Sequence, residues 1–136
     1  MSKIFVDTNL LVYALDQDQQ DKRDRSRELL GSLQEDRVGV LSTQVLQETY
    51  VVATTKLGVA PLDAKQVLQS LTGLELVTVT QAIIYDAIDC SILNRLSFWD
   101  GLILAAAASA KCDTLWSEDL NAGQTVRGVR VENPLA

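Results

Sequence analysis

Histidine is absent from this chain, and cysteine occurs only twice in its 136 residues. Cys90 and Cys112 lie within or at the end of helical patterns and do not have the spacing of metal ligands. The sequence therefore indicates neither a zinc site nor a disulfide framework, and we expect two reduced thiols.

Long apolar runs are also missing. The longest one, from Leu102 to Ala108, is far shorter than the roughly 20 residues that a membrane span needs. The first residues form a strand pattern that is interrupted by Asp7, which is not the pattern of a signal peptide. We therefore expect a protein that has no membrane partner and is located in the cytoplasm.

A surplus of basic residues is missing as well. The chain has 12 Lys and Arg against 18 Asp and Glu, which gives a net charge of −6. It therefore lacks the basic electrostatic footprint that is typical of nucleic-acid-binding domains. If the protein binds a nucleic acid, local Lys and Arg side chains or bound cations must supply the attraction for phosphate.

The composition is that of one folded domain. Apolar residues make up 47% of the chain and charged residues 22%, and the length fits a single core. We find no linker or internal repeat, so we predict one domain over residues 1–136. Short apolar segments at 4–6, 38–41, 74–79, 113–116 and 128–131 alternate with helical patterns, one of which is a charged surface helix between 17 and 36. This alternation predicts an α/β fold with a mostly parallel sheet that is covered by helices on both faces.

The opening segment runs from three apolar residues, 4–6, directly into Asp7, Thr8 and Asn9. It predicts a buried strand, a tight polar turn and then a helix. In open α/β sheets, ligands bind beyond the carboxyl ends of the strands, which is where Asp7 is expected. The simpler interpretation is that Asp7 or Asn9 only caps the helix that follows.

Two further acids belong to predicted helices. Glu48 lies at the edge of the apolar stripe of a helix that begins after Ser42 or Thr43, although such a residue is commonly a surface side chain. Asp100 stands at the start of a segment that has no polar face from Gly101 to Ala108, which predicts a buried helix. Asp100 and Ser97 also have the spacing of a capping box.

A fourth acid follows another short strand. Leu115 and Trp116 lead into Ser117, Glu118 and Asp119, which repeats the opening arrangement of a strand followed by polar groups. The spacing alone does not decide whether Glu118 or Asp119 points toward a site.

Right-handed crossovers between parallel strands bring the carboxyl ends of all strands to one edge of the sheet. Four carboxylates, from Asp7, Glu48, Asp100 and Asp119, are therefore expected around one crevice. A set of oxygen ligands without histidine or cysteine is the kind that holds Mg²⁺ or Mn²⁺. Such ions support hydrolysis of phosphodiester bonds, and they would offset both the mutual repulsion of the acids and the negative charge of the protein.

The segments FVDTN, SFWDGLILAAA and LWSEDLNAGQ, together with Glu48, resemble the PIN-domain ribonucleases, and most closely the VapC toxins of type II toxin–antitoxin pairs. The resemblance implies a three-layer α/β/α sandwich with a five-stranded parallel sheet. It also implies that Asp7, Glu48, Asp100 and Asp119 are the metal-binding catalytic acids, with Thr8, Asn9 and Ser117 as supporting polar groups. It further implies an RNA substrate, a homodimer and inhibition by a small cognate antitoxin.

A different class of function is also compatible with the residues. The chain could be a non-catalytic acidic α/β module whose carboxylates cap helices and bind a basic partner, and dependence on a metal ion distinguishes the two hypotheses. If an antitoxin binds, we expect its apolar contacts around Leu10, Leu11 and the helix end at Leu57. The choice of RNA depends on loop shape, which no motif in the sequence indicates.

Overall fold

A computed structural model describes residues 2–33, 37–71 and 73–136 of the chain. The end of the charged helix expected between 17 and 36 lies partly outside the described residues. The helices are α1 (Thr8–Leu15), α2 (Gln20–Ser32), α3 (Thr43–Thr55), α4 (Pro61–Gln69), α5 (Gln81–Asn94) and α6 (Phe98–Ser109). The strands are β1 (Lys3–Val6), β2 (Val38–Ser42), β3 (Glu75–Val77), β4 (Thr114–Trp116), β5 (Thr125–Val126) and β6 (Val129–Glu132).

The strands form one sheet in the order β3-β2-β1-β4-β6-β5. Every neighbouring pair is parallel except β5 with β6. The five expected parallel strands are therefore confirmed, and β5 is an additional antiparallel edge strand that the sequence analysis missed. It is only two residues long, and it reaches β6 through Arg127 and Gly128, both with positive φ, as a tight hairpin turn requires.

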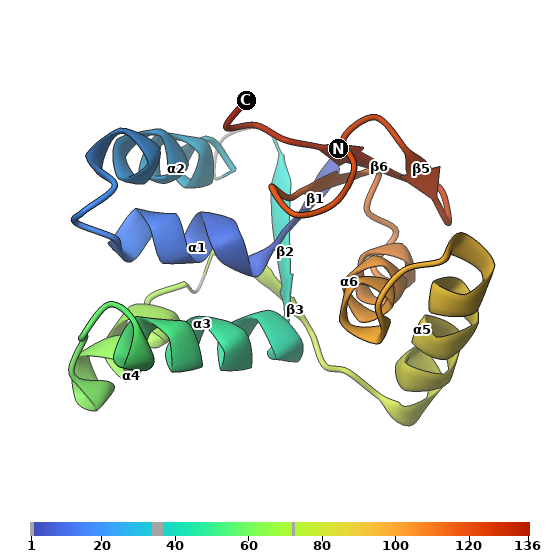
Figure 1. Ribbon diagram of the computed structural model, residues 1–136, viewed down its shortest axis with the longest axis horizontal. Helices are drawn as coiled ribbons and strands as arrows, with labels where there is room; N and C mark the ends of the chain where they lie inside the picture. The colour runs from blue at the N-terminus through green and yellow to red at the C-terminus, as the bar shows by residue number, and fades with distance from the viewer. Residues whose placement is uncertain (1, 34–36, 72) are drawn as a thin grey trace.

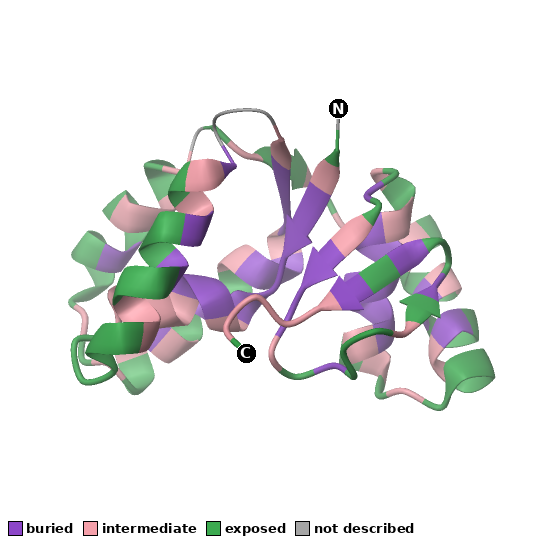
Figure 2. Cartoon of the chain, turned by 90° about the horizontal axis from the view of Figure 1, so that it is seen from above, coloured by how far each residue is buried: buried purple, intermediate pink, exposed green. Residues whose placement is uncertain are grey.

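The sheet separates two groups of helices, α1 to α4 on one side and α5 and α6 on the other (Figure 1). Figure 2 shows that buried residues are concentrated in the strands and on the helix faces turned toward them. The three-layer sandwich is thereby confirmed. The main core cluster is built from apolar side chains of β1, β2, β4 and β6 together with those of α1 and α6.

Local signals in the sequence account for the helix starts. Side-chain oxygens of Ser42, Thr80 and Ser97 accept hydrogen bonds from the first turns of α3, α5 and α6, as N-cap residues do. Helix α6 is buried from Gly101 to Ala107, as expected. A Cβ atom on Gly101 would lie 2.7 Å from the carbonyl oxygen of Ala87 on α5, so the close packing of these helices requires glycine at this position.

Some surface expectations need correction. Leu10 and Leu11 are buried in the core, so they are not available as contacts for an antitoxin. The reason is that α1 packs between α2 and α3 and both residues belong to the main core cluster, which the helix pattern alone did not show. On α5, Asp86 forms an ion pair with Arg127 at 2.8 Å, whereas Asp89 is exposed. Among the described residues, no helix is both long and apolar enough to span a membrane.

Candidate functional site at the carboxyl edge of the sheet

The site lies where the chain changes direction across the sheet. β2 and β3 lie on one side of β1, and β4 lies on the other, so the carboxyl ends of β1 and β4 form a topological switch point. The register pairs Val6 with Trp116, which places Asp7 beside Ser117. The backbone N–H of Asp7 donates to the carbonyl of Trp116 at 3.0 Å, so the two turns are held together.

Asp7 is a buried carboxylate with both oxygens engaged. One oxygen accepts from the backbone N–H of Thr8 at 2.7 Å, and the other accepts from the Ser117 hydroxyl at 2.8 Å. Asp7 as a whole is only 5% exposed to solvent. Burial raises the pKa of Asp7 to about 6, opposed by the hydrogen bonds from Ser117 and Thr8 and assisted by repulsion from Asp119 and Glu48. Asp7 also caps α1, so the capping interpretation and the site interpretation describe the same side chain.

Glu48 reaches the same place from α3. Its two carboxylate oxygens accept hydrogen bonds from the Thr8 hydroxyl at 3.0 Å and from the Gln44 side-chain amide at 2.9 Å. Gln44 also donates to the backbone carbonyl of Trp99 at 3.3 Å. Glu48 is therefore held toward the domain by polar contacts and is not a side chain that extends into solvent.

Asp100 approaches from the first turn of α6. Its backbone N–H donates to the Ser97 hydroxyl at 3.1 Å, which confirms the N-cap half of the expected capping box. Partial burial raises the pKa of Asp100, a side-chain hydrogen bond from Ser97 to the carboxylate lowers it, and repulsion from Asp119 and Glu48 raises it further. The carboxylate is thus close enough to the other acids to be affected by their charge.

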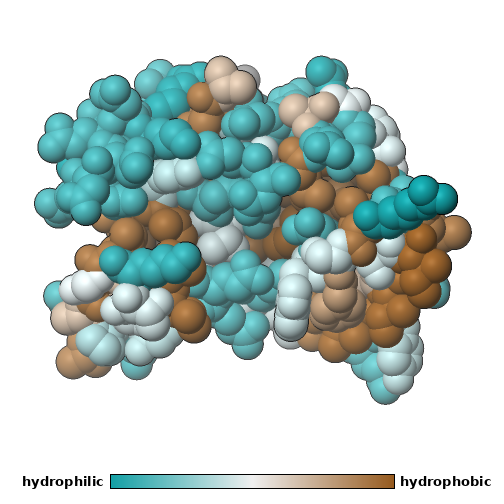
Figure 3. Space-filling model, in the orientation of Figure 1, coloured by the Kyte–Doolittle hydropathy of each residue, from teal (hydrophilic) through white to brown (hydrophobic). Residues whose placement is uncertain are grey.

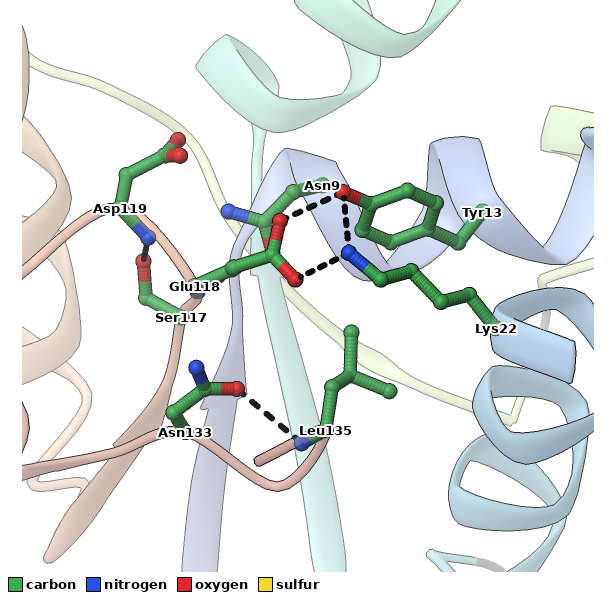
Figure 4. Close-up of polar contacts among 8 residues, drawn as sticks. All are labelled: Asn9, Tyr13, Lys22, Ser117, Glu118, Asp119, Asn133 and Leu135. Carbon is green, nitrogen blue, oxygen red and sulfur yellow. Dashed lines mark hydrogen bonds and ion pairs between the residues drawn. The ribbon is translucent and has the colours of Figure 1, made fainter. Parts of the chain in front are cut away.

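Glu118 and Asp119 point in different directions, as Figure 4 shows. Glu118 accepts hydrogen bonds from the Tyr13 hydroxyl and from the Lys22 ammonium group, the latter at 2.9 Å. These contacts hold the pKa of Glu118 below its ordinary value, the Tyr13 hydrogen bond having the largest effect. The Asp119 side chain lies away from this cluster, and its backbone N–H donates to the Ser117 hydroxyl at 3.1 Å.

All four predicted acids line one cavity of about 630 Å³, and Glu118 does not. Thr8 and Asn9 also line it, while Ser117 lies behind it and supports Asp7. The Asn9 side-chain oxygen accepts from the backbone N–H of Glu118 at 3.4 Å, which ties α1 to the turn after β4. Of the predicted site residues, six therefore line the cavity, namely Asp7, Thr8, Asn9, Glu48, Asp100 and Asp119. Ser117 contacts Asp7 from outside the lining, and Asp119 takes the place at the cavity that Glu118 does not.

The same cavity has wall residues that the sequence analysis missed, including Tyr13, Gln44, Lys56 and Trp99. A signal was available for Gln44, because it precedes Glu48 by one helical turn and so shares its face of α3. Tyr13 and Lys22 could not be linked to Glu118 in this way, since the contact spans 105 residues for Tyr13 and 96 for Lys22.

The ligand chemistry of the cavity fits a divalent metal ion. The four acids offer only oxygen ligands, as Mg²⁺ and Mn²⁺ prefer. Burial is the main cause of the raised pKa values of Asp7 and Asp100, and repulsion from Asp119 and Glu48 adds a smaller part that a cation would relieve. Over the described part of the chain, no three acidic, histidine or cysteine side chains are grouped closely enough to form a ready-made metal site. The acids therefore surround the cavity without being drawn together at one point.

The PIN domain family model matches residues 4–126. Because this match spans most of the sequence, the protein belongs to the PIN domain family. No curated protein gives a significant match to the chain.

Similar solved structures are VapC-type toxins and their complexes. VapC20 from Mycobacterium tuberculosis, described as a sarcin-ricin loop cleaving toxin, is 22% identical, with a TM-score of 0.67 over 85% of this chain and 91% of that one. A chain of VapBC2 from Rickettsia felis, bound to a promoter DNA fragment, is 20% identical, with a TM-score of 0.70 over 96% and 98%. A chain of DNA-bound VapBC from Salmonella typhimurium is 21% identical, with a TM-score of 0.71 over 98% and 99%. The protein shares its fold with these structures.

Proposed function

We propose that this PIN domain is a Mg²⁺- or Mn²⁺-dependent endoribonuclease that acts as the toxin of a toxin–antitoxin pair. The observation that carries the proposal is the convergence of Asp7, Glu48, Asp100 and Asp119 on one cavity. The relative from M. tuberculosis is described as a toxin that cleaves an RNA loop, and this supports RNA as the substrate.

In this proposal the four acids hold the metal, and neighbouring groups hold the acids. The Ser117 hydroxyl and the Thr8 N–H orient Asp7, while Thr8 and Gln44 orient Glu48. The chemistry that a bound Mg²⁺ or Mn²⁺ would supply is activation of a water molecule and neutralisation of charge on the phosphodiester. Because the protein has a net charge of −6, the carboxylates alone would repel phosphate.

The test is to incubate the purified protein with total cellular RNA, with Mg²⁺ or Mn²⁺ or with a chelator, and to map the new RNA ends. We expect cleavage that needs the cation and is lost in Asp119→Asn. Asp89→Asn, an exposed position on α5, is the matched control and should cleave normally. If no RNA is cut under any cation condition, the non-catalytic acidic module becomes the better hypothesis.

We also propose a small cognate antitoxin as a partner, in keeping with the VapBC assemblies among the similar structures. Asp16 and Asp18 line the cavity together with the four predicted acids. Such an acidic wall favours a cationic side chain, and an arginine guanidinium can bridge two carboxylates. Coexpression with the adjacent reading frame, followed by purification on one tagged partner, tests the proposal. A neighbouring protein that neither binds nor inhibits the nuclease would contradict it.

A homodimer and a cytoplasmic location complete the proposal. Ile84, Ile88 and Ile92 are exposed at one-turn intervals on α5, and Figure 3 shows hydrophobic atoms gathered over this helix at the right of the molecule. An apolar stripe of this kind is typical of an association surface. Light scattering should give a dimer that Ile88→Glu disrupts, with Leu62→Glu on the exposed face of α4 as the control.

The proposed cytoplasmic location is supported by Cys90 and Cys112, two free and buried thiols of the kind that a reducing compartment maintains.

A further inference from the structure

Trp99 is an exposed aromatic side chain at the edge of the acid cavity. It is the second residue of α6 and is 62% exposed, although it directly precedes Asp100. The Phe98 ring packs against it edge to face, with 5.1 Å between ring centroids. Its backbone carbonyl accepts the hydrogen bond from Gln44, which also binds Glu48. The Phe98 ring therefore supports the indole and the Gln44 amide holds the backbone of Trp99, while much of the indole surface remains open.

A second cavity, of about 510 Å³, adjoins the acid cavity. The two share Thr8, Gln44, Glu48, Val52 and Trp99, and the second adds Gln47 and Val51. Its wall thus combines an aromatic ring and two valines with two amide side chains. Apolar walls with a few polar groups are typical of sites that bind small organic groups.

The charges of this wall decide which part of an RNA it suits. Among the described residues, the wall contains the carboxylate of Glu48 and no lysine or arginine. It therefore offers nothing that attracts a phosphate. A nucleobase is neutral, has two flat apolar faces that stack on aromatic rings, and has a polar edge that an amide can meet.

We propose that this second cavity is a base-binding subsite, in which an unpaired nucleobase of the RNA stacks on Trp99 beside Val51 and Val52. The inference rests on the proposed ribonuclease function. Because the two cavities share a wall, the phosphate next to the stacked base lies over the four acids. Only an unpaired base can enter, so the subsite selects single-stranded or loop RNA over duplex.

The first test measures cleavage of a short RNA that contains the mapped site, with wild type, Trp99→Ala and Trp99→Phe. We expect Trp99→Ala to lower kcat/KM by about 5- to 150-fold, which is the range given by stacking energies, and Trp99→Phe to give an intermediate value. Tyr85→Ala is the matched control, because Tyr85 is an aromatic residue that is 59% exposed on α5 and lines neither cavity. It should cleave normally.

The second test removes the base from the RNA. When each nucleotide next to the cleaved bond is replaced in turn by an abasic one, a position should exist at which wild type slows and Trp99→Ala does not slow further. If Trp99→Ala carries its full loss on every abasic RNA, the base-stacking proposal is wrong. If Trp99→Ala cleaves normally but no longer binds the antitoxin, the surface is a protein-docking site and the proposal is also wrong.

A binding measurement separates this proposal from the proposed function. In Asp7→Asn, a short single-stranded RNA should quench indole fluorescence, and the quenching should be absent when Trp99→Phe is added, because the other tryptophan, Trp116, is buried. The same sequence as a duplex should not quench. Quenching without any cleavage by wild type would refute the nuclease and keep the subsite, whereas cleavage without quenching would refute the subsite alone.

Discussion

Asp7→Asn should stabilise the metal-free protein while it abolishes cleavage. The carboxylate of Asp7 is buried and is repelled by Asp119 and Glu48, and these effects raise its pKa to about 6 from an ordinary 3.8. One pKa unit corresponds to about 1.4 kcal/mol, so ionisation of Asp7 costs the folded state about 3 kcal/mol at neutral pH. Asparagine has nearly the same shape, can accept the Thr8 N–H, and can donate to the Ser117 oxygen.

The raised pKa of Asp7 also predicts how the stability difference between Asp7→Asn and wild type changes with pH. A carboxyl whose pKa is raised by folding contributes most to stability below its unfolded pKa, and this contribution is lost as the pH rises through the folded value. The stability difference between Asp7→Asn and wild type should therefore be small near pH 4 and complete above about pH 7. For a domain of this size, the gain at neutral pH corresponds to a rise of about 10 °C in Tm.

The assay is a thermal melt of both proteins in a chelator across this pH range, beside the nuclease assay. Asp89→Asn is the control, and it should change neither Tm nor cleavage. Asp86 is unsuitable for this purpose because it is paired with Arg127. An Asp7→Asn variant that is less stable at neutral pH, or equally stabilised near pH 4, would refute the electrostatic argument. Full cleavage by the variant would refute the role of Asp7 as a metal ligand.

Three further predictions concern the metal, the helix packing and the thiols. Mg²⁺ or Mn²⁺ should raise the Tm of the wild type, because an ion that binds only the folded acids stabilises them, and Asp100→Asn should reduce this rise in a parallel melt. Gly101→Ala should lower the free energy of unfolding by about 1 to 3 kcal/mol, because the Cβ of the alanine would lie 2.7 Å from the Ala87 carbonyl oxygen. Urea titrations measure this change, and an unchanged midpoint would contradict the prediction. Burial raises the pKa of the Cys112 thiol to about 12 and Cys90 is also buried, so mass spectrometry should find neither alkylated until the protein is unfolded.

The residue pattern by itself determined the layers of the fold and pointed to Asp7, Glu48 and Asp100 as acids of one crevice. Apolar runs that end in polar turns, as at Asp7, locate strand ends, and parallel strands linked through helices must bring those ends to one edge. The polar-free stretch after Asp100 required a buried helix. These conclusions follow from periodicity and chain connection, which act over short distances along the sequence.

Tertiary structure alone decided between neighbouring residues and assigned the partners. The spacing placed Glu118 and Asp119 in the same turn, and only the contacts of Glu118 with Tyr13 and Lys22, roughly a hundred residues away in the chain, leave Asp119 for the cavity. Leu10 and Leu11 had the same apolar character as a docking surface, and only the packing of α1 between α2 and α3 shows that they belong to the core. The sequence analysis assigned no role to Trp99, and only the structure shows that it lines two adjoining cavities. Such outcomes depend on side chains from distant elements that compete for the same space and hydrogen bonds, and local sequence patterns carry no information about that competition.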